Sequence, residues 1–152
     1  MSIELVISGG QTGADQAGLM AAIALKIKTG GFAPKNWVTE VGPNPVLKLY
    51  GLTEYHLKGY PPRTKANVAW ADATIIFSSR PGPGSRLTER YCGQLNKFCS
   101  VVPVDSRAVT VELVRAFLEI VKPTTLNIAG SRESKADGIH DFVYDVLMVT
   151  LA

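Results

Sequence analysis

The chain has 152 residues, 46% of them apolar, which matches one ordinary domain that buries a core without disulfides or metals. Sixteen basic and thirteen acidic residues give a net charge of +3, which suits a small anionic ligand but not a nucleic-acid partner. No signal-peptide pattern or window of roughly 18 apolar residues is present, so we expect a cytoplasmic protein without a membrane partner. Cys92 and Cys99 lack metal or redox spacing and are interpreted as buried thiols, with chance pairing as the alternative.

The first third of the chain predicts one strand-helix unit followed by an irregular excursion. A β-branched apolar run at 3–8 predicts a buried strand, and apolar residues at helical spacing predict a helix from Ala14 to about Lys28. We expect Thr29-Gly30-Gly31 to break the chain after this helix. Five prolines and little periodicity over residues 32–62 indicate a short second strand and a long loop, a kind of segment that is often functional.

The remainder alternates between strands and helices. The pattern predicts helices at 63–71, 87–98, 114–121 and 139–147, and strands at 73–78, 100–104 and 125–129. Such alternation implies right-handed crossovers and a parallel sheet. We therefore expect a single α/β domain over residues 1–152, a Rossmann-like three-layer sandwich with about five mostly parallel strands and helices on both faces.

Ligands of open parallel sheets bind beyond the carboxyl ends of the strands, so the segments that follow strands are the candidate site. Loops 9–15, 80–86 and 130–135 combine glycine or hydroxyl residues with a helix start, where free N–H groups favour an oxyanion. The candidate ligand-binding residues in or beside these loops are Gly9, Gly10, Gln11, Thr12, Gly13, Asp15, Gly84, Ser85, Arg86, Thr88, Gly130, Ser131, Arg132, Ser134 and Lys135.

The loop residues also have a purely structural interpretation. Thr12 with Asp15, and the 134–137 segment, have the spacing of a helix capping box. The glycines are spaced GGxxG, without the GxGxxG fingerprint or a P-loop lysine. Capping does not account for Arg132 and Lys135, two cations beside one helix start, although such a pair could also be a solvated surface.

Two further groups are open to two interpretations. Arg63 and Asn67 fall on one helical face and could present a guanidinium and an amide to the same ligand, or could simply start a surface helix. The excursion's aromatic residues could stack on a flat heterocycle, but we favour anchoring of the excursion to the sheet. The only histidines are His56 and His140, and neither a metal-ligand spacing nor a GxSxG elbow occurs, so no intrinsic metal site is predicted.

Several segments resemble the molybdenum carrier proteins, a branch of the superfamily that includes lysine-decarboxylase-like proteins and cytokinin-activating phosphoribohydrolases. The resemblance covers nearly the whole chain and rests on ISGGQTGADQAGL, TGGFAPK, YGLTE, RTKANV, DATIIFS and LNIAGSRESKADGI. It implies a Rossmann-like fold, assembly as a homodimer or homotetramer, and a ligand such as molybdenum cofactor, an anionic phosphate-bearing pterin.

One loop departs from both related patterns. Where the carrier family has glycine-glycine-threonine before leucine-threonine, this chain has Gly84-Ser85-Arg86. The phosphoribohydrolase motif PGGxGTxxE overlays residues 81–89 but keeps only the proline, the first glycine and Glu89. Glu89 could be the catalytic carboxylate for cleaving an N-glycosidic bond, or an exposed acid that complements the helix dipole.

The leading hypothesis is a non-catalytic binding or carrier protein for a phosphate-bearing small molecule, molybdenum cofactor or a related nucleotide. The enzymatic alternative is a nucleoside-monophosphate phosphoribohydrolase that uses Glu89. A third hypothesis is a nucleotide sensor that acts on a partner protein.

Overall fold

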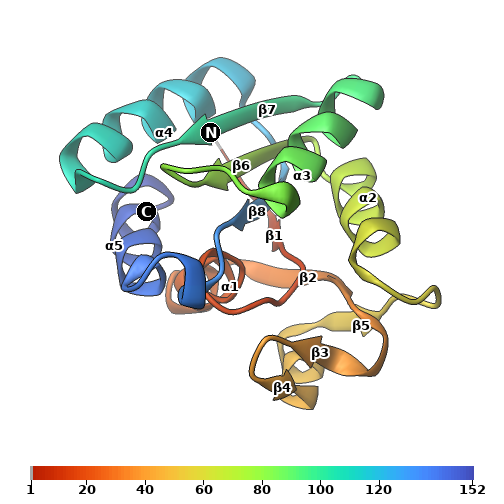
Figure 1. The fold of residues 1–152 in the computed structure, drawn as a ribbon. Helices are drawn as coiled ribbons and strands as arrows, with labels where there is room; N and C mark the ends of the chain where they lie inside the picture. Colours follow the sequence, from red (N-terminus) through yellow and green to blue (C-terminus); the bar gives the residue numbers. More distant parts are fainter. Residues whose placement is uncertain (1) are drawn as a thin grey trace.

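The computed structural model describes residues 2–152 (Figure 1). A six-stranded parallel sheet has the order β5-β2-β1-β8-β6-β7, and β3 and β4 form a separate antiparallel hairpin. The strands are β1 (Leu5–Ile7), β2 (Lys28–Ala33), β3 (Val38–Thr39), β4 (Gly42–Pro43), β5 (Leu52–Glu54), β6 (Ala73–Phe77), β7 (Phe98–Val102) and β8 (Thr125–Gly130). The helices are α1 (Ala14–Ala24), α2 (Tyr60–Trp70), α3 (Pro83–Gln94), α4 (Arg107–Val121) and α5 (Ile139–Thr150), with short 3₁₀ segments at Lys35–Trp37, Pro45–Tyr50 and Glu133–Lys135.

Helices cover both faces of the sheet, which confirms the predicted α/β sandwich. Figure 1 shows α1, α4 and α5 on one face and α2 and α3 on the other. The contacts agree with this arrangement, because α5 packs against α1 and α4, and α2 packs against α3. The main core lies under the first group. Helix α5 buries Ile139, Phe142, Val143, Val146 and Leu147, whose helical spacing puts them on one stripe. Each such burial stabilises the fold by about 1.5–3 kcal/mol.

The glycines after α1 belong to a strand, so the predicted break at this position was wrong. Helix α1 ends at Ala24, and β2 runs from Lys28 through both glycines in parallel with β1. The left-handed φ of Lys26, 62°, turns the chain earlier than the apolar spacing suggested. Gly31 lies so close to β1 that a Cβ there would be 2.1 Å from the Ser8 carbonyl oxygen. The glycine allows the two strands to approach, and its weak strand propensity misled the prediction.

Several other boundaries also differ from the prediction, and two of the differences have a clear physical cause. Helix α3 ends at Gln94, and Phe98, which was assigned to this helix, begins β7 instead. Asn96 has a left-handed φ of 54°, which separates the two elements. Phe98 matches helical spacing, but it is 62% exposed on the edge strand of the sheet. Helix α2 begins at Tyr60 rather than Arg63, with prolines in its first turn, where a missing N–H is tolerated.

The excursion is ordered and adds β5, the strand beyond the five expected. Leu47 and Leu52 join Leu19 and Ala33 in a second small core, and Trp37 and Tyr50 pack against it. The Tyr55 ring lies edge-on to the Phe32 ring, with 5.3 Å between centroids. These contacts confirm that Trp37, Tyr50 and Tyr55 anchor the excursion to the sheet and α1, whereas the Tyr60 ring lies 5.5 Å from the Arg63 guanidinium carbon.

Candidate functional site

The topology places the three candidate loops at one edge of the sheet. All six strands are parallel, so the loops after β1, β6 and β8 lie at the same edge. Strand β8 leads into α5 on one face, whereas its neighbour β6 leads into α3 on the other (Figure 1). Adjacent strands whose helices go to opposite faces form a topological switch point, the place where α/β sheets bind ligands.

The loops after β1, β6 and β8 are in direct contact. The Ala14 N–H donates to the Ser131 carbonyl oxygen at 3.2 Å, and the Ser131 N–H donates to that of Phe77 at 3.0 Å. The Ser131 hydroxyl donates to the Ser78 hydroxyl at 3.0 Å. A Cβ on Gly13 would lie 2.5 Å from the Ser131 carbonyl oxygen, so the loops after β1 and β8 pack backbone to backbone.

Within the first loop, the glycines are in contact with the rest of the chain. A Cβ on Gly9 would meet the Arg63 guanidinium, and one on Gly10 would lie 2.7 Å from the Leu47 side chain. Gly130 is packed against β6 in the same way, with the Phe77 carbonyl oxygen 2.3 Å from the position of a Cβ. At these three glycines, other segments of the protein, and not a ligand, therefore lie close to the backbone.

The first loop's amides are largely satisfied by its own side chains. The Gln11 N–H donates to the Asp15 carboxylate at 3.2 Å, the Gly10 N–H to the Ser8 hydroxyl at 3.3 Å, and the Thr12 N–H to the Gln11 side-chain oxygen at 3.1 Å. Helix α1 begins at Ala14, and its cap residue Gly13 has no side-chain cap, so the alternative interpretation of Thr12 and Asp15 as a capping box is wrong. Asp15 instead turns back into the glycine loop.

Asp15 and Arg63 form a buried pair beneath this loop. The Asp15 carboxylate and the Arg63 Nη1 are 3.9 Å apart, and the two residues are 6% and 9% exposed. Burial raises the pKa of Asp15 to about 6, although Arg63 and the Gln11 and Gly9 amides lower it. Burial likewise lowers the pKa of the guanidinium. The Nε of Arg63 has no hydrogen-bond partner within residues 2–152, which is costly for a buried charged group.

Glu40, in the turn of the β3-β4 hairpin, was missed by the sequence analysis and contacts two candidate loops. The Thr12 hydroxyl donates to Glu40 Oε1 at 2.6 Å, and the Ser134 N–H donates to the same oxygen at 3.1 Å. The Ser134 hydroxyl donates to Oε2, and the Arg132 Nε lies 3.8 Å from it. The only sequence signal was an acid beside a Gly-Pro turn, which is not specific.

The pKa of Glu40 is lowered by these contacts. Burial of the side chain acts in the opposite direction, but the hydrogen bonds from Ser134 and Thr12, together with the charge of Arg132, outweigh it. Ser134 is thus bonded to Glu40, and α5 begins at Ile139 after the cap residue Gly138, which has no side chain to cap the helix. Glu133 accepts the Gly138 and His140 N–H groups at 2.6 and 3.0 Å, so this acid, and not the capping box that 134–137 offered as an alternative, binds the N–H groups at the start of α5.

Two candidate residues are bonded to the protein's own main chain. The Asn67 amide accepts the Phe32 N–H at 2.8 Å and donates to the Phe32 carbonyl at 3.0 Å, which ties α2 to β2. The Thr88 hydroxyl donates to the Gly84 carbonyl at 3.0 Å, one turn earlier in α3. Arg63 and Asn67 do lie on the buried side of α2, but only Arg63 retains an unsatisfied donor.

The loop after β6 is the open one of the three. Among residues 2–152, no atom outside the adjoining residues and the helix's own backbone lies within 4 Å of a Cβ built on Gly82 or Gly84, and α3 begins without a side-chain cap. Ser85 is half-buried and Arg86 is exposed beside it. Glu89 is exposed further along α3, and Lys135 is exposed at the end of the third loop.

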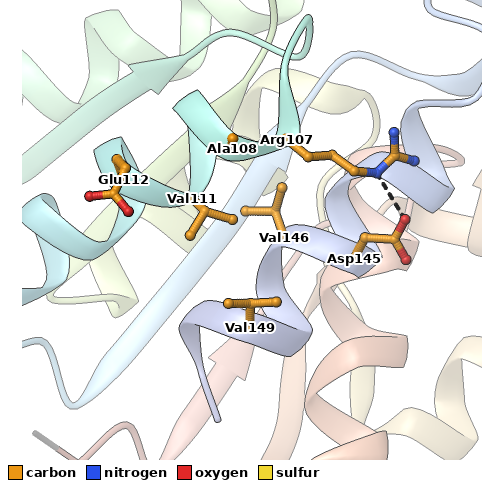
Figure 2. A pocket seen from close by; sticks show the side chains of 7 residues that line it. All are labelled: Arg107, Ala108, Val111, Glu112, Asp145, Val146 and Val149. Atoms are coloured by element: carbon orange, nitrogen blue, oxygen red, sulfur yellow. Dashed lines mark hydrogen bonds and ion pairs between the residues drawn. The ribbon is translucent and has the colours of Figure 1, made fainter.

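Two of the pockets that residues 2–152 form are relevant to function. One, of about 510 Å³, adjoins the candidate loops and is lined by Thr12, Gly13, Gln16, Glu40, Val41, Glu133, Ser134, Asp137 and His140. The other, of about 400 Å³, lies between α4 and α5 (Figure 2). Figure 2 shows valines along the second pocket and the Arg107 to Asp145 ion pair, 2.9 Å, at one end. The first pocket has the polar groups that a ligand site requires.

Within the described residues no cluster of three or more His, Cys, Asp or Glu side chains has metal-binding geometry. Over the same part of the chain, no helix is long and apolar enough to cross a membrane.

Comparison with known proteins identifies the family. The crystal structure of a protein from Syntrophus aciditrophicus SB, named "Putative molybdenum carrier protein", superposes with a TM-score of 0.91 at 37% sequence identity, covering 99% of this chain and 96% of that one. No curated protein is significantly similar in sequence. A family model described as the circularly permutated YpsA SLOG family matches residues 6–151. Because this match spans almost the whole chain, the protein belongs to the circularly permutated YpsA SLOG family.

Proposed function

We propose that the protein binds and carries a phosphate-bearing small molecule, either molybdenum cofactor or a related nucleotide. The observation that carries the proposal is the buried Arg63 guanidinium, which has an unpartnered Nε and lies against Gly9 in the loop after β1. Its nearest carboxylate, Asp15, is 3.9 Å away, beyond hydrogen-bond distance. Because Nε itself is buried, a ligand oxyanion would contact the part of the Arg63 side chain that remains accessible, 11% of it, and would offset the cost of burying the charge.

The phosphate position is the start of α3. The Gly10, Gln11 and Thr12 amides of the first loop are occupied by side chains, whereas Gly82 and Gly84 face open space and α3 has no side-chain cap. Unpaired N–H groups at a helix start bind phosphate oxygens well. Arg63 and Gly84 both lie in the first turn of their helices, α2 and α3, which pack together on the same face. The two groups therefore face the same end of the sheet.

The choice of cargo rests on the named role of the Syntrophus neighbour. The phosphate of a pterin or nucleotide would be bound by the α3 start and Arg63, and the 510 Å³ pocket has room for a heterocycle. Molybdenum, if present, is part of the cargo and is held by the pterin.

Native mass spectrometry of freshly purified protein tests the proposal, since it detects any retained small molecule and denaturation releases it for identification. We expect a phosphate-bearing pterin or a nucleotide. The same spectrum gives the number of subunits and tests the expected homodimer or homotetramer.

Arg63→Met should weaken binding of the identified molecule by about 10- to 100-fold, because it removes a charge-assisted hydrogen bond. Arg63→Lys keeps the charge and pairs with Asp15, and it separates loss of binding from loss of stability. Arg107→Met is the matched control, because Arg107 pairs with Asp145 between α4 and α5. Unchanged affinity in folded Arg63→Met would contradict the proposal.

The phosphoribohydrolase alternative is tested with the same protein. If the protein releases ribose 5-phosphate from a nucleoside monophosphate and Glu89→Gln abolishes this release, the protein is an enzyme and not a carrier. The exposed position of Glu89 on α3 gives that alternative no specific support.

A further inference from the structure

The carboxylate of Glu40 is bound in the way that proteins bind a free anion. Its two oxygens accept hydrogen bonds from the Thr12 hydroxyl, the Ser134 N–H and the Ser134 hydroxyl, and the Arg132 guanidinium lies 3.8 Å away. The side chain is only 11% exposed. Hydroxyls, a main-chain N–H and a guanidinium are the same donors that bind phosphate oxygens. An oxyanion position therefore exists where the loops after β1 and β8 meet, and part of the chain occupies it.

The hairpin that carries Glu40 is joined to the loops mainly by this residue. Strands β3 and β4 have two residues each and pair only with each other. The Glu40 N–H donates to the Gln11 side chain at 2.9 Å, and the neighbouring Val41 is 81% exposed. A two-stranded hairpin this short has little stability of its own. Glu40 therefore makes the hydrogen bonds that join the hairpin to the loops after β1 and β8.

An external anion at this position has to replace Glu40. A monocarboxylate ligand would offer the donors the same number of oxygens and the same charge as Glu40, so it gains nothing by the exchange. A phosphoryl dianion offers a third oxygen and a second charge toward Arg132. The Glu40 carboxylate thus excludes monocarboxylates from this position and allows phosphoryl dianions to bind there.

We propose that Glu40 is an internal competitor that makes this position selective for phosphoryl groups over carboxylates, and that its displacement releases the β3-β4 hairpin. The inference rests on the proposed function, because it assigns a second anionic group of the same ligand to the junction of the two loops. It adds a gate to the site: the hairpin covers the pocket when it is empty of phosphate and lifts when phosphate binds.

The test is calorimetric titration with pyrophosphate of the full-length wild type, Glu40→Ala and Glu40→Gln. We expect Glu40→Ala to bind pyrophosphate at least about tenfold more tightly, since the charge-assisted bonds of the competitor are worth more than about 1.4 kcal/mol. Acetate should compete with pyrophosphate in Glu40→Ala and not in the wild type. Glu54→Ala is the matched control, because Glu54 is an acid of the same excursion that accepts the Asn36 N–H at 2.6 Å.

Hydrogen exchange distinguishes displacement of Glu40 by pyrophosphate from tighter binding that results only from the loss of a negative charge in Glu40→Ala. In the wild type, pyrophosphate should protect residues 131–135 and accelerate exchange over residues 38–44. If pyrophosphate binds while 38–44 is unchanged or more protected, or if Glu40→Ala binds it no more tightly, the inference is overturned and the proposed function stands. If none of the three proteins binds pyrophosphate at millimolar concentration, both the inference and the proposed function are overturned.

Discussion

Gly13 is the point at which the loops after β1 and β8 touch, and its replacement by alanine should be among the costliest small changes in the protein. Its φ of 79° and ψ of −128° lie in a region that is almost restricted to glycine, so alanine costs about 1–3 kcal/mol in backbone strain. The added Cβ would also lie 2.5 Å from the Ser131 carbonyl oxygen and 2.8 Å from the Glu133 nitrogen. Both are backbone atoms, so relieving the overlap costs about 1–3 kcal/mol more.

Gly138 provides the matched control. It precedes α5 as Gly13 precedes α1, it also has a positive φ of 83°, and nothing lies within 4 Å of its Cβ position. Gly138→Ala should therefore cost only the left-handed penalty of about 1–2 kcal/mol. Urea denaturation of both variants measures the free energies of unfolding, and the difference should be about 2 kcal/mol or more. Equal losses in the two variants, with unchanged m-values, would refute the close packing of the two loops.

Two further changes probe the buried polar groups. Asn67→Ala should lower the free energy of unfolding by about 1–3 kcal/mol for each Phe32 main-chain group that it leaves unpaired. Asn67→Asp should restore only the hydrogen bond that the Phe32 N–H donates, because a carboxylate cannot donate to the Phe32 carbonyl. Urea denaturation of both variants measures these losses. The folded-state pKa of Asp15, about 6, is above its unfolded value of 3.8, so the folded state binds the proton more tightly. Relative to Asp15→Asn, the wild type should lose up to about 3 kcal/mol as pH rises from 4 to 6 and nothing more above that. A flat difference over this window would contradict the burial of the charge.

Most elements follow from local pattern. The stripe of α5 and the five buried residues of β6 are strong signals because one is periodic and the other is continuously apolar. The prediction of secondary structure failed where contacts between distant segments override the local helix or strand propensity. Gly31 stands in a strand because β1 passes too close for a side chain, and that contact has no local signature. Phe98 belongs to an edge strand, where burial gives no pattern to detect.

The position of the candidate site could be predicted because the carboxyl ends of parallel strands share one edge. The partners of its side chains could not. Asp15 and Thr12 fitted helix caps by spacing, but the first satisfies the glycine loop and the second binds an acid 28 residues away. Asn67 bonds to Phe32, 35 residues away, and this pairing depends on how α2 is placed on β2. Contacts between distant segments carry no periodicity, so spacing alone does not reveal them.

The location of β8 has a consequence for biosynthesis. Strand β8 lies between β1 and β6, with Thr125 paired to Leu5 and Leu126 to Ala73, although it is the last of the strands to leave the ribosome. Until β8 arrives, β1 and β6 each present an unpaired edge, and β1 can pair only with β2. The nascent chain therefore cannot close its sheet as it emerges, and insertion of β8 is expected to be the late, slow step of folding and the stage most exposed to aggregation.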